Sequence, residues 1–102
     1  MTKRQVERRT NRRFRLCLPV TAKDSRGGEI SAFTRDISCR GICFFVREPV
    51  ALGSRIQLLL TLPPEVTSNG PVPVKCRARV VRVQQNCISS AVAAVIEDYT
   101  IG

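Results

Sequence analysis

The sequence predicts an all-β protein, a six-stranded antiparallel β-barrel with little or no C-terminal helix. Three observations lead to this fold class: short segments alternate apolar and polar residues, turn-forming residues separate these segments, and no segment has a convincing helical period. With 102 residues, of which 43% are hydrophobic, the chain has material for one modest core. We therefore expect a single barrel domain over residues 16–102, preceded by a flexible basic arm over residues 1–15.

The expected strands are separated by segments rich in glycine, proline and asparagine. Pro19 indicates a strand start or a sheet edge, and Gly41 ends a tight connection between the second and third strands. In the fifth strand, Val81 falls out of phase with a clean apolar–polar alternation, which indicates a β-bulge. The longest expected loop, residues 63–73, contains four prolines. The six expected strands are residues 16–22, 30–37, 42–46, 56–62, 74–84 and 89–96.

Two apolar features raise the question of what covers the strands. The last strand, residues 89–96, is apolar almost throughout, so we expect it to be buried on both faces or covered by something beyond the end of the chain. Phe44 and Phe45 are adjacent and must point to opposite faces of the third strand. We expect one of them in the core and the other over a barrel end or a partner site, with packing in the core or at the barrel mouth as the simpler interpretation for both.

Positive charge is concentrated at the N-terminus. The net charge is +9, and residues 1–15 hold seven basic residues against one acidic residue, which accounts for +6 of it. The rest of the chain, with ten basic and seven acidic residues, is nearly balanced. Such an arm predicts an anionic partner, either nucleic acid, a nucleotide or an acidic lipid surface, whereas a solvated tail is the simpler interpretation.

The composition speaks against catalysis, metal binding and membrane insertion. The chain has no histidine, and no serine, cysteine or carboxylate pair stands in a recognisable catalytic motif. No cofactor or metal site is expected, because no CxxC pair exists. Without an apolar run of membrane length or a secretory signal, a cytoplasmic location is the default. Most of the cysteines are interpreted as reduced and buried: Cys17, Cys39, Cys43, Cys76 and Cys87.

Two polar motifs stand out. The first lies in the basic arm and runs from Arg8 and Arg9 to Arg13. The second is a DxSxxG string, Asp36-Ile37-Ser38-Cys39-Arg40-Gly41, between two expected strands. Each is weak evidence alone, since arginines recur throughout the arm and Asp, Ser and Gly commonly make a plain β-turn.

In this order the two motifs resemble the signature of the PilZ domain family, RRxxxR before the first barrel strand and [DN]xSxxG at a strand junction. The resemblance continues through Leu18-Pro19-Val20, LGSRIQLLLTLP at 52–63 and VKCRARVVRV at 74–83. It implies a split barrel that binds cyclic di-GMP and catalyses nothing. Two features depart from the family: the last strand lacks the usual glycine and aromatic residues, and there is no room for the usual C-terminal helix. Another subunit or a longer parent protein is therefore left open.

The resemblance also implies a ligand-binding set. Arginine forms bidentate hydrogen bonds with phosphate oxygens and with guanine O6 and N7. An aspartate can accept hydrogen bonds from guanine N1–H and the exocyclic amine. A serine adds a short hydroxyl, and a glycine lets the backbone approach a ligand closely. The implied residues are Arg8, Arg9, Arg13, Asp36, Ser38 and Gly41, with Arg12 and Arg40 as weaker candidates.

The expected function is that of a cyclic di-GMP receptor whose arm becomes ordered on the ligand and which signals to a downstream protein or a fused domain, with a homodimer as one arrangement. One alternative is a nucleic-acid-binding barrel, which would need exposed stacking aromatics. The nearly neutral barrel and the few aromatic residues speak against specific nucleic acid. The other alternative is a PilZ-like interaction module without a ligand, against which the intact motifs speak.

Overall fold

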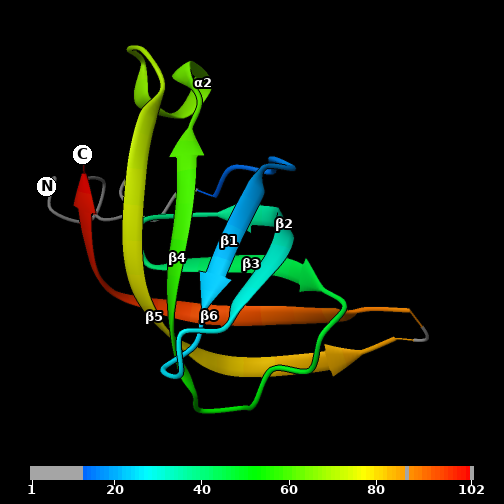
Figure 1. Cartoon of the computed structure of the whole chain (residues 1–102). Coiled ribbons are helices and arrows are strands. Elements are labelled where there is room, and N and C mark those ends of the chain that lie inside the picture. Colours follow the sequence, from blue (N-terminus) through cyan, green and yellow to red (C-terminus); the bar gives the residue numbers. More distant parts are fainter. Residues whose placement is uncertain (1–12, 87, 102) are drawn as a thin grey trace, which may run out of the picture.

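The computed structural model describes residues 13–86 and 88–101, and these form a closed six-stranded antiparallel barrel (Figure 1). The order around the barrel is β1-β2-β3-β6-β5-β4, and pairing of β4 with β1 closes it. The predicted fold class is confirmed. The elements are β1 (Pro19–Lys23), β2 (Glu29–Ile37), β3 (Gly41–Val46), β4 (Arg55–Leu62), α2 (Pro64–Thr67), β5 (Val72–Gln85) and β6 (Ser90–Ile101).

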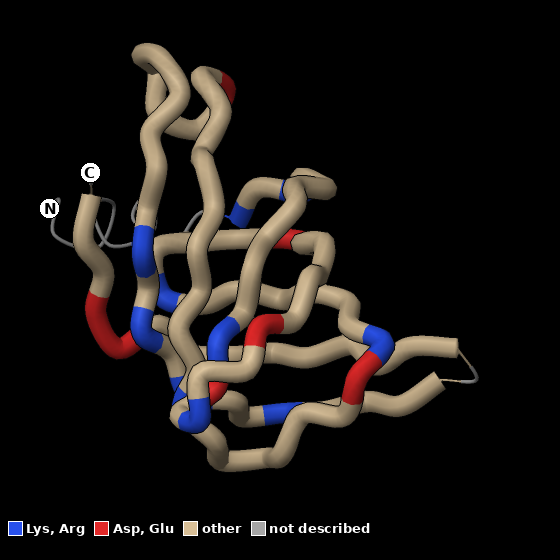
Figure 2. The backbone as a smooth tube through the Cα atoms, in the orientation of Figure 1, with Lys and Arg blue, Asp and Glu red and all other residues tan. Residues whose placement is uncertain are grey.

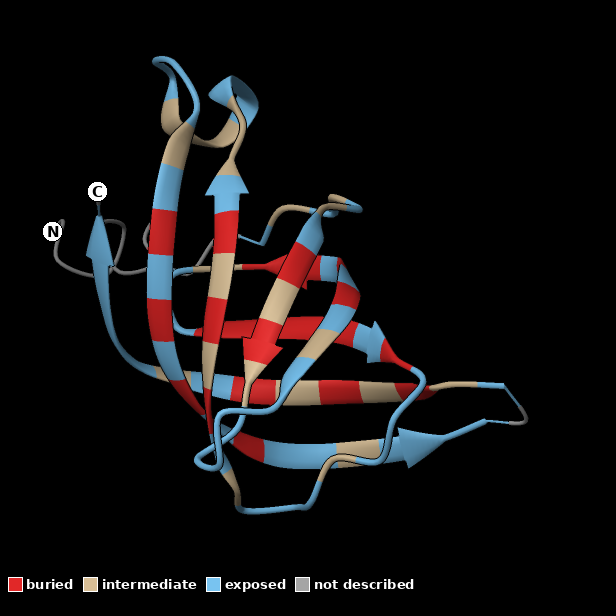
Figure 3. Ribbon diagram, viewed as in Figure 1, coloured by how far each residue is buried: buried red, intermediate tan, exposed pale blue. Residues whose placement is uncertain are grey.

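The core lies inside the barrel and is filled by alternate residues of every strand, as the banding of buried and exposed residues in Figure 3 shows. Phe44 is the largest fully buried side chain, at 0% exposure, whereas its neighbour Phe45 is 38% exposed on the outer face. The expectation that these two residues point to opposite faces is confirmed. Burial of a side chain of this size stabilises the fold by about 1.5–3 kcal/mol.

Three register shifts interrupt the strand pairing: one in β6, where Glu97 is the extra residue, and two that change which residues face outward near the turn from β2 to β3 and on β5. In β5, Val80 pairs with Ala94 and Arg82 with the preceding residue of β6, so Val81 is the extra residue. The predicted bulge is confirmed. In β2, Thr34 pairs with Phe44 and Asp36 with Cys43, so Arg35 is the extra residue of a bulge that the sequence pattern did not predict.

The last strand is longer than predicted. It continues beyond residue 96 to Ile101, and its final residues pair with Val74–Arg77 of β5. Polar residues are accommodated there because they point outward and form ion pairs across the strands: Glu97 with Arg55 and Arg79, and Asp98 with Arg77. Figure 2 shows acidic positions interspersed among basic ones over the described barrel. The described barrel therefore has no broad, uninterrupted basic face in this region.

Of the two alternatives expected for the last strand, burial on both faces is wrong for the described barrel, while a cover from beyond the end of the chain stays a prediction. Its inner face is buried at Ser90, Val92 and Ala94, but on the outer face Val95 is 40% exposed. The side chains of Ala91 and Ala93 are only half-buried. The small side chains of Ala91 and Ala93 keep the outer surface of β6 low next to Val95.

The start of β1 and the segment after β4 also differ in secondary structure from the prediction. The first strand begins at Pro19 rather than residue 16, because Leu16 and Leu18 lie beside β2 and bond to Thr34. The expected loop 63–73 contains the short helix α2 and the first two residues of β5. Pro64 is tolerated in the first turn of α2 since that position needs no backbone N–H. Figure 1 shows β4 and β5 extending past the other strands to carry α2.

Candidate ligand-binding site

The second motif forms the turn from β2 to β3, and Ser38 holds it together. The Ser38 Oγ accepts hydrogen bonds from the backbone N–H groups of Gly41, at 3.1 Å, and Arg40, at 3.3 Å. The Ser38 backbone N–H donates to the Gly41 carbonyl at 2.8 Å. Because its oxygen is engaged within the turn, Ser38 frames the site by shaping the backbone.

Gly41 begins β3 at a place where a side chain would be crowded. A β-carbon there would lie 3.3 Å from the carbonyl oxygen of Ala94 on β6 and 3.6 Å from Nη2 of Arg13. The first of these distances is tighter than ordinary van der Waals contact. The glycine therefore allows close pairing of β3 with β6 and lets the Arg13 guanidinium lie over the strand.

Asp36 lies between two arginines. Its Oδ1 accepts a hydrogen bond from Arg13 Nη1 at 2.6 Å, and its Oδ2 accepts one from Arg35 Nε at 2.9 Å. The Asp36 side chain is only 10% exposed, whereas those of Arg13 and Arg35 are 57% and 54% exposed. Asp36 faces outward only because the bulge at Arg35 reverses the strand alternation, which otherwise would point it into the barrel.

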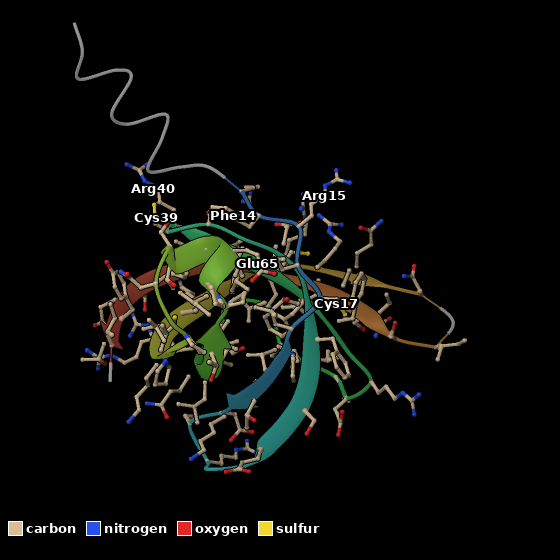
Figure 4. All side chains as sticks on the ribbon, turned by 90° about the horizontal axis from the view of Figure 1, so that it is seen from above. Phe14, Arg15, Cys17, Cys39, Arg40 and Glu65 are labelled. Carbon is tan, nitrogen blue, oxygen red and sulfur yellow. The ribbon has the colours of Figure 1, made fainter. Side chains whose placement is uncertain are left out.

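Arg13 is positioned by its neighbour. The backbone N–H of Phe14 donates to the Ile37 carbonyl at 2.8 Å, and the Ile37 N–H donates to the Phe14 carbonyl at 3.0 Å. The Phe14 side chain packs against the core. In Figure 4, Phe14 lies near Cys39 and Arg40, on the side of the molecule that carries the turn. The end of the predicted arm, residues 13–15, is thus attached to the end of β2.

A groove of about 500 Å³ lies next to this turn on the outer face of β3, β6 and β5. Gly41, Cys43, Ala93 and Val95 form its shallow floor, and arginines line it. The lining arginines are Arg13, Arg40 and Arg82. A planar, anionic ligand lying on the sheet would find small residues beneath it and guanidinium groups around it.

A second hollow, of about 290 Å³, lies at the barrel end near α2. Its lining includes Phe14, Leu62, Val66 and Tyr99 and carries no charged side chain. An anionic ligand would lose its hydration there without gaining a compensating charge. The outer-face groove is therefore the better candidate for a nucleotide site.

Cys43 lies on the floor of the groove, where burial and the neighbouring charges act on the pKa of its thiol in opposite directions. Burial raises the pKa of the Cys43 thiol, while the nearby guanidinium groups of Arg35, Arg82 and Arg13 oppose the rise. At neutral pH the thiol is protonated and serves as a small neutral floor residue. The expectation that most cysteines are buried holds for Cys43 and Cys76, whereas Cys17, in the segment before β1, and Cys39, in the turn after β2, are exposed. Cys87 lies outside the described residues.

The structure brings together four of the predicted ligand residues: Arg13, Asp36, Ser38 and Gly41. Arg40, a weaker candidate, is exposed and lines the same groove. The remaining predictions, Arg8, Arg9 and Arg12, lie outside the described residues.

Sequence reasoning missed three residues of this site: Arg35, Cys43 and Arg82. The position of Arg35 depends on a bulge that leaves no mark in the apolar–polar pattern. For Arg82 a signal was present, because the predicted bulge at Val81 implies that the next residue changes face. No motif indicated Cys43.

Within residues 13–86 and 88–101, no helix is long and apolar enough to cross a membrane. No group of three or more histidine, cysteine, aspartate or glutamate residues in that part of the chain is arranged to hold a metal ion.

The fold and the groove define a small binding domain, since the groove supplies charge and hydrogen-bonding groups over a closed barrel. Residues 7–98 match the sequence model of the PilZ domain, and the chain belongs to the PilZ domain family. This is a family of non-catalytic domains that bind cyclic di-GMP. The resemblance of the two motifs is thereby confirmed.

A solved structure with a similar fold is the Bacillus subtilis inhibitor of motility (MotI/DgrA), with a TM-score of 0.70 and 18% sequence identity. The similarity covers 86% of this chain and 42% of that chain, so this chain matches less than half of that protein's length. At this identity the likeness shows the shared fold. Comparison with curated proteins gave no match.

Proposed function

We propose that the domain binds cyclic di-GMP in the outer-face groove. One observation carries the proposal: the two motifs, whose residues Arg13 and Asp36 are 23 positions apart in sequence, meet through a 2.6 Å hydrogen bond at the edge of that groove. Membership in the PilZ family supports the identity of the ligand. The proposed binding residues are those that the sequence predicted: Arg8, Arg9, Arg13, Asp36, Ser38 and Gly41.

The proposed roles follow from the geometry of the turn. Nη2 of Arg13 lies above Gly41, where it can bind a phosphate oxygen of a ligand that approaches the glycine. The Asp36 carboxylate can accept from guanine N1–H and the exocyclic amine, in exchange for part of its contact with Arg13. Ser38 and Gly41 keep the backbone of the turn in place beneath the base.

We first predict that the domain binds cyclic di-GMP saturably in calorimetric titration and does not bind GTP or cyclic GMP comparably. Arg13→Ala should weaken binding by about 10- to 150-fold, since hydrogen bonds to charged groups contribute about 1.5–3 kcal/mol. Arg47→Ala, which removes an exposed arginine from the loop after β3, is the matched control and should bind like the parent protein. Salt-sensitive binding of a short RNA without binding of cyclic di-GMP would contradict the proposal and favour a nucleic-acid-binding barrel. Absence of binding to every ligand tested would favour an interaction module.

The domain division that we propose has two parts with different tasks, an arginine-rich arm over residues 1–15 and the barrel over residues 16–102. The attachment of Phe14 to Ile37 holds Arg13, the described end of the arm, at the groove edge. Arginines 8 and 9 would then fold onto the phosphates, and the arm would become ordered on the ligand. The newly ordered face would signal to a downstream protein or a fused domain in the cytoplasm.

Arm ordering gives a second prediction, which limited proteolysis tests. Saturating cyclic di-GMP should slow tryptic cleavage after Arg8 and Arg9, because an ordered arm fits a protease active site poorly. Cleavage after Arg26, which lies exposed in the turn between β1 and β2, serves as the internal control and should not change. Equal cleavage rates at the arm with and without ligand would refute the ordering step while leaving ligand binding intact.

A further inference from the structure

One row of paired residues crosses the outer face of the barrel over four strands. Asp36 of β2 pairs with Cys43 of β3, Cys43 with Ala93 of β6, and Ala93 with Arg82 of β5. Neighbouring strands lie about 4.8 Å apart, so the row is about 14 Å long between its ends. A carboxylate and a guanidinium thus stand at opposite ends of a row whose middle consists of small side chains.

Both ends of this row are turned outward by a β-bulge. The extra residue Arg35 brings Asp36 onto the outer face, and the extra residue Val81 does the same for Arg82. With strict alternation from buried Val80, Arg82 would point into the core. Bulges commonly re-aim side chains next to binding sites, and here two of them aim charged side chains along one groove.

Arg82 differs from the other arginines of β5. Arg77 and Arg79 are paired with Asp98 and Glu97 of β6. Arg82, in contrast, forms no hydrogen bond or ion pair with any part of the chain that the structure describes, and it lines the groove. Arg82 and Cys43, at the centre of the row, line the same groove.

We propose that Arg82 is a specificity-determining residue that binds the guanine of cyclic di-GMP remote from Asp36. The inference rests on the proposed function. Cyclic di-GMP has two identical guanines, and if Asp36 binds one, the second lies farther along the groove, toward β5. Arginine donates two hydrogen bonds to the O6 and N7 acceptors of guanine, whereas adenine has an amino donor in place of O6. Arg82 would therefore favour guanine over adenine at this position.

The experiment compares cyclic di-GMP with cyclic GMP-AMP of the same phosphodiester linkages by calorimetry. The mixed ligand keeps both phosphates and one guanine for Asp36 but presents adenine to Arg82. The parent protein should prefer cyclic di-GMP by about 5- to 150-fold, the range expected for one bidentate arginine–guanine contact. Arg82→Ala should weaken binding of cyclic di-GMP by a similar factor and bind the two ligands equally. The matched control is Arg79→Ala on the same strand, which should retain the preference.

Three outcomes would overturn the assignment of Arg82 to a guanine. If Arg82→Ala binds cyclic di-GMP like Arg79→Ala, the residue does not contact the ligand. If the variant loses the same factor for both ligands, Arg82 acts on a phosphate instead of a base. If the variant keeps the full preference for cyclic di-GMP, another residue reads the second guanine. Failure of the parent protein to bind either ligand would instead refute the proposed function, so the two failures are distinguishable.

Discussion

Replacing Phe44 with alanine is expected to lower the free energy of unfolding by about 3–5 kcal/mol. Phe44 is fully buried and lies on β3 between β2 and β6, so its loss leaves a cavity enclosed by strands that are hydrogen-bonded on both sides. A closed barrel cannot collapse onto such a cavity without breaking strand pairs. Single domains are stable by about 5–15 kcal/mol, so the loss is a large share of the total. Urea denaturation followed by circular dichroism measures it.

The matched control is Phe45→Ala, which changes the same residue type one position along the same strand. Phe45 lies on the outer face and pairs with exposed Phe33, a cross-strand contact that contributes about 0.2–1 kcal/mol. Phe44→Leu should fall between the two and keeps the comparison measurable if Phe44→Ala does not fold. Equal destabilisation by Phe44→Ala and Phe45→Ala would contradict the orientation of β3.

The main features of the barrel were predictable because they depend on local patterns. Alternation of apolar and polar residues identified the strands, and the phase error at Val81 indicated its bulge. The adjacency of Phe44 and Phe45 required one core and one surface residue. Each of these arguments uses only the period of two that a strand imposes on its side chains.

Features that depend on distant partners were not predictable in this way. The extension of β6 through Glu97 and Asp98 is stabilised by arginines of β4 and β5 that are far away in sequence. The residues of α2 were expected to form part of a proline-rich loop, although proline suits the first turn of a helix. The apolar run of the last strand indicated burial on both faces or a cover from beyond the end of the chain, whereas in the structure its residues 93–95 line an open groove.

The candidate site was predictable only in part, and chiefly through the resemblance to a family. The motifs identified Arg13 and Asp36, but nothing in their spacing showed that the two side chains bond to one another. The bulge at Arg35, which turns Asp36 outward, depends on how β2 pairs with β3. The contribution of Arg82 required the order of the strands, because β5 is adjacent to β6 rather than to β3.

Asp36→Asn is expected to weaken cyclic di-GMP binding by on the order of 30- to 1000-fold, or about 2–4 kcal/mol. The substitution keeps the shape of a side chain that is only 10% exposed, but it removes the charge between Arg13 and Arg35. The amide can accept at one atom only, so it cannot serve both the arginines and the two donors of a guanine edge. The two guanidinium groups are also left together without a counter-charge, which disfavours the geometry that holds Arg13 over Gly41. Calorimetry with cyclic di-GMP measures the loss.

The matched control is Asp98→Asn, because Asp98 also pairs with an arginine on the outer face of the barrel. Its side chain is 52% exposed and lies outside the groove, so this variant should bind cyclic di-GMP like the parent protein and lose little stability. In the double variant Arg13→Ala/Asp36→Asn, the losses should be less than additive, since the two side chains form one contacting pair. Fully additive losses would mean that Arg13 and Asp36 bind the ligand independently. Equal affinities for Asp36→Asn and Asp98→Asn would mean that Asp36 serves only the fold, and the ligand would then have to bind elsewhere on the barrel.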